Sequence, residues 1–132
     1  MRYLLDTNII SALIRDPDGP VAEHIREAGE TNVYTSIIVA AELHFGVAHS
    51  GSARLAARLA GALARIEALP LQAPADAIYG ELRARLRRIG NQIGGNDLMI
   101  ASHALALGHT LVTDNGREFS RIAELPIENW LR

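Results

Sequence analysis

Four acidic residues stand in otherwise apolar stretches of this chain, where a solvated carboxylate is least expected. They are Asp6, Glu42, Asp97 and Asp114. If the fold brings them together they repel one another, because two like charges about 4 Å apart cost roughly 4 kcal/mol at an effective dielectric of about 20. No arginine or lysine lies within eight positions of Glu42 or Asp97 to relieve this repulsion by local ion pairing. A divalent cation that takes oxygen ligands would relieve it, so the pattern predicts a metal site.

Composition limits the classes to which the protein can belong. At 132 residues we expect a single domain, spanning 1–132. The absence of cysteine excludes disulfides, thiolate catalysis and cysteine-based zinc sites. No segment approaches the length of a membrane span or has the layout of a signal peptide, so we expect a cytoplasmic protein that does not bind membranes. A net charge of −2 provides no global attraction for nucleic acid.

Short apolar runs alternate with longer amphipathic patterns, and together they indicate the elements that must position the acidic residues. The apolar runs predict strands at 2–5, 32–35, 69–71, 110–113 and 127–130. The amphipathic patterns predict helices that end near residues 14, 28 and 49, further helices at 55–66, 78–89 and 96–107, and a helical turn near Glu118. Apolar rather than alternating strands, separated by helices, are typical of a buried sheet. We therefore expect an α/β fold with a central, mostly parallel sheet of four or five strands flanked by helices.

This arrangement places the acidic residues at one edge of the sheet. Asp6 and Asp114 each follow directly on a predicted strand, and ligands of parallel sheets bind beyond the carboxyl ends of the strands. The second predicted strand ends at the same edge. There Ser36 can cap the helix that contains Glu42. The joint placement favours a common site.

Each carboxylate also has an ordinary explanation when it is considered alone. Asp6 or Asp97 can simply cap a helix. Asp114, in a Thr-Asp-Asn-Gly sequence, can be a turn residue. Glu42 can be solvated on a polar helix face, although apolar neighbours at helical spacing, such as Ile38, argue against an exposed stripe.

Four segments of the chain resemble the motifs of PIN-domain ribonucleases, specifically the VapC-type toxins of toxin–antitoxin pairs. The segments are Leu4–Ile9, Ser36–Leu43 with Gly46, Ile93–Ala101, and Leu111–Asn115 continuing through Glu118 and Phe119. They occur in the family's order and span nearly the whole chain, including the ending at Trp130. The fourth motif departs from the pattern, because many members have an acidic residue where this chain has Asn115. Either Asp114 substitutes from one position earlier, or Asn115 and Glu118 complete the site.

The resemblance implies hydrolysis of RNA phosphodiester bonds that depends on Mg2+ or Mn2+. It implies that Asp6 and Asp97 bind the metal directly. Glu42 would complete the coordination or orient a water molecule. Asn8 and Thr113 would support the ligands by hydrogen bonds. The five histidines form no HxxxH or HExxH pattern, so we interpret them as structural or surface residues.

The resemblance also implies a VapB-like antitoxin as partner. Few aromatic residues (5%) argue against a stacking platform for single strands, so we expect a structured RNA such as tRNA as substrate. We also expect a homodimer. Apolar positions on the helices at 55–66 and 78–89 exceed what a thin sheet can cover, which leaves surface for a homodimer interface or an antitoxin groove, unless an intramolecular core takes it up. Arginines on the same two helices are candidate contacts to RNA phosphates, although a solvated helix face explains them slightly better. The candidates are Arg54, Arg58, Arg83 and Arg87.

Two other functions fit the sequence less well. A haloacid-dehalogenase-type phosphohydrolase needs a DxDxT nucleophile motif after the first strand, and this chain has Asp6-Thr7-Asn8 there. A non-catalytic antitoxin or RNA-binding module would need no metal, so a titration with Mn2+ separates it from an enzyme.

Overall fold

Five parallel strands form the central sheet in the order β3-β2-β1-β4-β5. The computed structural model describes all residues, 1–132. The strands are β1 Tyr3–Leu5, β2 Val33–Ser36, β3 Glu67–Leu69, β4 Thr110–Val112 and β5 Ile127–Glu128. Every pairing in the sheet is parallel, and β1 is hydrogen-bonded to β2 on one side and β4 on the other. The expected α/β fold with a parallel sheet is confirmed.

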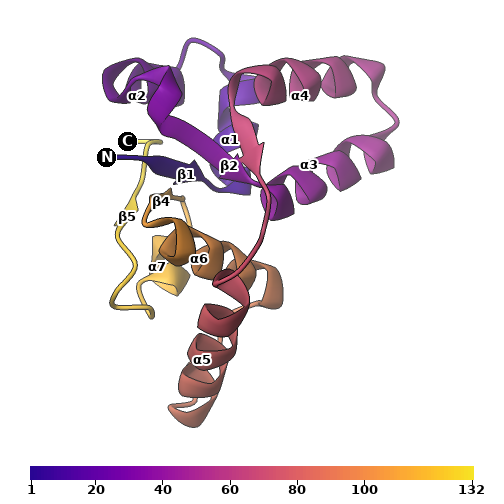
Figure 1. The fold of residues 1–132 in the computed structure, drawn as a ribbon. Helices are drawn as coiled ribbons and strands as arrows, with labels where there is room; N and C mark the ends of the chain where they lie inside the picture. Colours follow the sequence, from indigo (N-terminus) through magenta and orange to yellow (C-terminus); the bar gives the residue numbers. More distant parts are fainter.

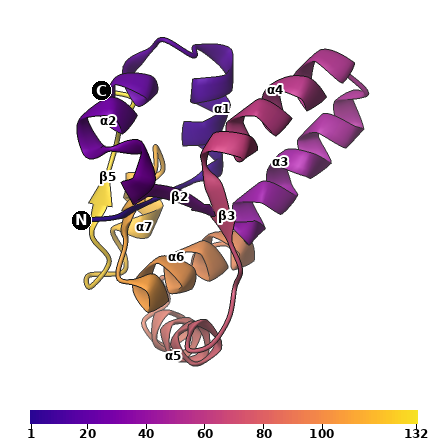
Figure 2. The ribbon, with the colours of Figure 1, turned by 45° about the horizontal axis from the view of Figure 1, so that its top comes forward.

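Seven α-helices and one 3-10 turn connect the strands. They are α1 Thr7–Arg15, α2 Pro20–Ala28, η1 Glu30–Asn32, α3 Ile37–Ser50, α4 Ala53–Arg65, α5 Ala75–Arg88, α6 Gly95–Leu107 and α7 Gly116–Phe119. In Figures 1 and 2, α3 and α4 form a pair that projects to one side of the sheet. Helix α5 packs beside α6, and the far end of α5 points away from the sheet. The chain adds β2 and β3 on one side of β1 and then crosses the sheet to add β4 and β5 on the other side. Because connections between parallel strands are right-handed, the helices before and after this reversal lie on different sides of the sheet. None of the helices is both long and apolar enough to cross a membrane.

The core lies on both faces of β1, the central strand, and of its neighbour β4. Leu4, Leu5, Leu111 and Val112 are completely buried, as expected for strands covered by helices on both sides. Phe119 and the terminal Trp130 join the same apolar cluster from the far end of the chain. β1 and β4 are therefore held rigidly, and the residues that follow them start from fixed positions.

The two edge strands differ most from the sequence prediction, and β5 covers only Ile127–Glu128 rather than 127–130. The edge strand β3 covers Glu67–Leu69, two residues earlier than the expected 69–71, and pairs Glu67 with Tyr34 of β2. Proline has no backbone N–H to donate to a ladder, so Pro70 ends the strand. The exposed Leu71, which suggested a strand, instead lies in the connection to α5.

Candidate metal and active site at the carboxyl edge of the sheet

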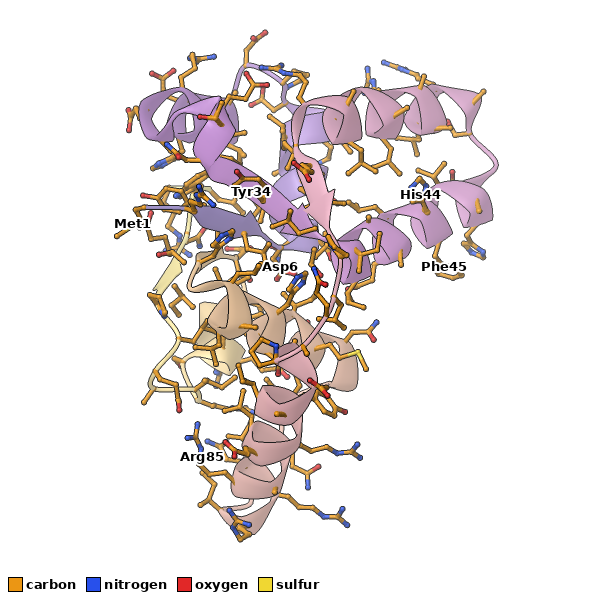
Figure 3. The ribbon with its side chains drawn as sticks, viewed as in Figure 1. Met1, Asp6, Tyr34, His44, Phe45 and Arg85 are labelled. Carbon is orange, nitrogen blue, oxygen red and sulfur yellow. The ribbon has the colours of Figure 1, made fainter.

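Asp6 lies at the carboxyl end of β1, at the centre of the molecule (Figure 3). Its backbone N–H donates to the carbonyl of Val112 on β4, so the last pairing of the sheet fixes its position. One carboxylate oxygen accepts the backbone N–H of Thr7 (2.8 Å), and the other accepts the hydroxyl of Thr113 (2.7 Å). Burial raises the pKa of Asp6, and these two hydrogen bonds partly oppose that shift. Each oxygen keeps a second lone pair with which to bind a cation.

Asp97 lies in the first turn of α6, next to the other carboxylates. Its pKa is raised to about 6, first by burial and then by the negative charges of Asp6, Glu118 and Glu42, in that order. The side chain of Asn115 approaches one of its oxygens at 3.4 Å and lowers the pKa slightly. Four carboxylates therefore act on one another at this edge.

Glu42 faces the site from α3, where it is partly buried. Burial, followed by the charge of Asp6, raises its pKa. Its Oε1 atom is buried and has no hydrogen-bond partner, and neither has the hydroxyl oxygen of Thr7, although that hydroxyl lies near enough to favour the charged form of Glu42. A buried carboxylate oxygen is costly when nothing binds it, so this atom is available for a ligand that the protein itself does not supply.

The fourth carboxylate of the cluster is Glu118 rather than Asp114. Glu118 accepts hydrogen bonds from the backbone N–H of Gly94 (3.1 Å) and from the side chain of Asn115 (3.0 Å), and these lower its pKa. Asp114 is exposed and accepts instead from the side chain of Asn129 (2.9 Å). The side chain of Thr113 points to Asp6 and that of Asn115 to Asp97, so the residue between them points away.

Two of the predicted supporting residues also meet at this edge. Thr113 donates its hydroxyl to Asp6 and accepts the backbone N–H of Asn115 (2.9 Å), so it joins the two ends of the site. Asn8 accepts the backbone N–H of Asp114 at 3.3 Å. Thr7 was not singled out in the sequence, although its position directly after Asp6 at the start of α1 is the signal that could have identified it.

The donor set fits a hard divalent cation. The converging groups are carboxylate oxygens, which Mg2+ and Mn2+ prefer as ligands, and the mutual repulsion of these carboxylates is what a cation would neutralise. No group of three or more acidic or histidine side chains is arranged so that it could hold a metal ion by itself. A bound ion would therefore keep some water ligands, as Mg2+ usually does.

Comparison with known proteins identifies the fold and its chemistry. The sequence profile of the PIN domain matches residues 3–125. Ribonuclease VapC2 of Rickettsia felis is 42% identical over 98% of both chains. The chain belongs to the PIN-domain family of VapC ribonucleases. The tRNA(fMet)-specific endonuclease VapC of Shigella flexneri is 34% identical, again over 98% of both chains.

Solved structures give the same result. The chain superposes with a TM-score of 0.89 and 40% identity on a chain of VapBC2 from Rickettsia felis bound to a DNA fragment from its promoter, covering 98% of this chain and 99% of that one. VapBC-1 from nontypeable Haemophilus influenzae gives a TM-score of 0.86 at 33% identity with complete coverage of both chains. The PIN-like fold expected from the four motifs is confirmed, and the protein is a ribonuclease.

The raised pKa of Asp97 predicts how the metal-free protein responds to pH. Because its folded pKa of about 6 exceeds the ordinary 3.8, the folded state holds the proton more tightly than the unfolded state does. Asp97 therefore contributes stability at low pH that is lost as the pH rises from about 4 through about 6. We expect the urea midpoint of the wild type, measured with chelator, to fall more over this interval than that of Asp97→Asn. If the urea midpoints of the wild type and of Asp97→Asn fell equally over this interval, the result would contradict the interaction of Asp97 with the other carboxylates.

Proposed function

We propose that this chain hydrolyses RNA phosphodiester bonds at the carboxylate cluster, as the toxin of a toxin–antitoxin pair, with Mg2+ or Mn2+ as its cofactor. The observation that carries the proposal is the unpartnered buried oxygen of Glu42 beside the mutually repelling Asp6 and Asp97. We take residues 1–132 as one PIN domain. We place its action in the cytoplasm, where RNA is available.

The site residues receive distinct roles in this proposal. Asp6 and Asp97 bind the cation, and Glu42 binds it too or orients a water molecule with its free oxygen. Glu118, held by Asn115, supplies the fourth carboxylate. A bound divalent cation lowers the pKa of a water ligand and neutralises negative charge on the phosphate oxygens. Thr113 keeps Asp6 in place for this chemistry through its hydroxyl.

We propose that RNA approaches along α5. Arg83 is one of the arginines predicted to contact RNA phosphates, and it lines a pocket of about 300 Å3 together with Tyr79. Gly95 and Leu98 line the same pocket, and they lie on either side of Asp97 on α6. Arg83 and Arg87 have no carboxylate partner, in contrast to Arg85, which pairs with Glu124. Arg54 is unpaired too but lies on α4. A relative's name specifies tRNA(fMet), and we propose a structured RNA of that kind as the substrate.

A second cavity is the candidate site for the antitoxin. It measures about 300 Å3 and lies between α1, α2 and α4, where Leu13, Ile25 and Ala62 provide apolar walls. Arg58 and Arg65 border the same cavity, so Arg58 faces an antitoxin rather than RNA in this proposal. The similar solved structures are named as VapBC complexes, which supports a VapB-like partner.

The homodimer is proposed from the apolar surface of α3. Ile37 and Phe45 are exposed there, Phe45 to 70%, and Phe45 stacks only on the neighbouring His49. Figure 3 shows Phe45 on the outer side of α3. A second copy of the chain would cover these side chains.

The experiment that tests the function removes the metal. Purified chain incubated with total tRNA is expected to cleave it in the presence of Mg2+ or Mn2+, and cleavage should stop when the chelator EDTA is added. Returning Mn2+ in excess should restore it. Cleavage that continues undiminished in EDTA would contradict a metal-dependent mechanism. The ratio of the cleavage rates in Mg2+ and in Mn2+ shows which of the two cations supports the reaction better.

A further inference from the structure

A buried hydrogen bond joins the two helices that carry Glu42 and Asp97. Nδ1 of His103, on α6, lies 2.8 Å from the hydroxyl oxygen of Ser36, at the end of β2. His103 is 1% exposed and Ser36 is completely buried. The Ser36 oxygen also accepts the backbone N–H of Ile38 at 3.1 Å and so caps the start of α3. We call this connection the Ser36–His103 tie.

The hydrogen-bonding capacity of the groups assigns the direction of the tie. Burial lowers the pKa of His103, so its ring is neutral and carries one proton. The Pro70 carbonyl lies near the ring and favours its protonated form, whereas Nε2 has no hydrogen bond of normal geometry. We assign Nδ1 as the acceptor and the Ser36 hydroxyl as its donor. This leaves a lone pair of Ser36 free for Ile38, whereas the opposite tautomer leaves the hydroxyl proton without an acceptor.

We propose that His103 is a positioning residue for the metal site, acting through Ser36 on the placement of Glu42 relative to Asp97. Ser36 fixes where α3 begins, and Glu42 follows six residues later on that helix. His103 stands six residues after Asp97 on α6. This inference rests on the proposed role of the carboxylates in binding metal.

The tie opposes a force that the site itself creates. Without a cation, Glu42 and Asp97 repel each other, so their charges tend to separate α3 from α6. Apart from the tie, no side-chain hydrogen bond links these two helices or their caps. A buried hydrogen bond between the cap of one helix and the body of the other holds the carboxylates together before the metal arrives.

A merely structural hydrogen bond would alter stability and leave the metal unaffected, so the test measures Mn2+ binding. The variants are Ser36→Ala, His103→Leu, the double variant of these two, and His103→Asn, whose amide oxygen can accept at the position of Nδ1. The matched control is Ser102→Ala. Ser102 is equally buried on α6, but its hydroxyl donates to Leu98 of the same helix and joins nothing else.

Isothermal titration of each folded variant with Mn2+ alone is expected to give an affinity about tenfold weaker for Ser36→Ala and His103→Leu. The double variant should bind no more weakly than either single one, because all three lack the same tie. In RNA cleavage, kcat should fall while KM is unchanged. His103→Asn should recover most of the affinity, and Ser102→Ala should match the wild type.

Affinities of Ser36→Ala and His103→Leu equal to that of Ser102→Ala, or losses that add up in the double variant, would overturn the inference. Failure of the proposed function looks different, because the wild type itself would then neither bind Mn2+ nor cleave RNA. In that case hydrogen exchange at the Ile38 amide of the metal-free protein decides the tie. Faster exchange in His103→Leu than in wild type supports it, and equal rates refute it.

Discussion

Asp97→Asn is expected to lower metal-dependent RNA cleavage by at least about 100-fold, more than the loss of an outer hydrogen-bonding partner usually costs. The substitution removes one of the converging charges without changing the volume of the side chain. Asp6→Asn should give the same loss. The melting temperature of metal-free Asp97→Asn should equal or exceed that of the wild type, because the repulsion from Asp6, Glu118 and Glu42 is relieved.

The matched control for this experiment is Asp76→Asn. Asp76 also lies in the first turn of a helix, α5, but it is exposed and has no part in the carboxylate cluster. Cleavage by Asp76→Asn should equal that of the wild type. Full activity of Asp97→Asn, or an equal loss in both variants, would show that the cluster is not the active site.

The second large effect is expected at Glu118. Glu118→Gln should weaken Mn2+ binding and slow cleavage by about 10- to 100-fold, whereas Asp114→Asn should change either by no more than about twofold. Both changes replace a carboxylate by its amide within the same short segment. Of these two residues, only Glu118 contributes to the raised pKa of Asp97. The comparison is made by titration with Mn2+ and by initial rates of tRNA cleavage.

An opposite ranking would change the picture of the site. If Asp114→Asn lost all activity while Glu118→Gln kept it, Asp114 would have to turn away from Asn129 when metal binds. That result would favour the alternative in which Asp114 takes the role of the acidic residue that many family members have at the position of Asn115.

The sequence was sufficient to predict the parallel sheet and the convergence of three carboxylates, because apolar strands and parallel connections leave few alternatives. Asp6 follows β1 directly, so its place was fixed once that strand was recognised. The choice between Asp114 and Glu118 depends on which way individual side chains point after β4, and spacing along the chain does not determine that. The edge strand β3 was misplaced because a single edge has few partners to define its register.

The histidines show a different limit. His103 was interpreted as a structural or surface residue and is buried, but no sequence pattern indicated that its partner would be Ser36. The two residues are 67 positions apart and meet only after the sheet and α6 have formed. Contacts of this kind between distant segments depend on the completed packing, which no local pattern contains.

The pairing of β1 with β4 determines when during synthesis this enzyme can become active. The hydrogen bond between Thr113 and Asp6 closes a span of 107 residues, and Glu118 lies later still. A ribosome exposes the beginning of a chain well before its end, and domains are synthesised from the N-terminus. The growing chain therefore carries Asp6 and Glu42 without their partners until almost the whole protein has emerged. The site is therefore incomplete until β4 has paired with β1, and the chain acquires its full set of carboxylates only after the segment that contains Glu118 has been synthesised.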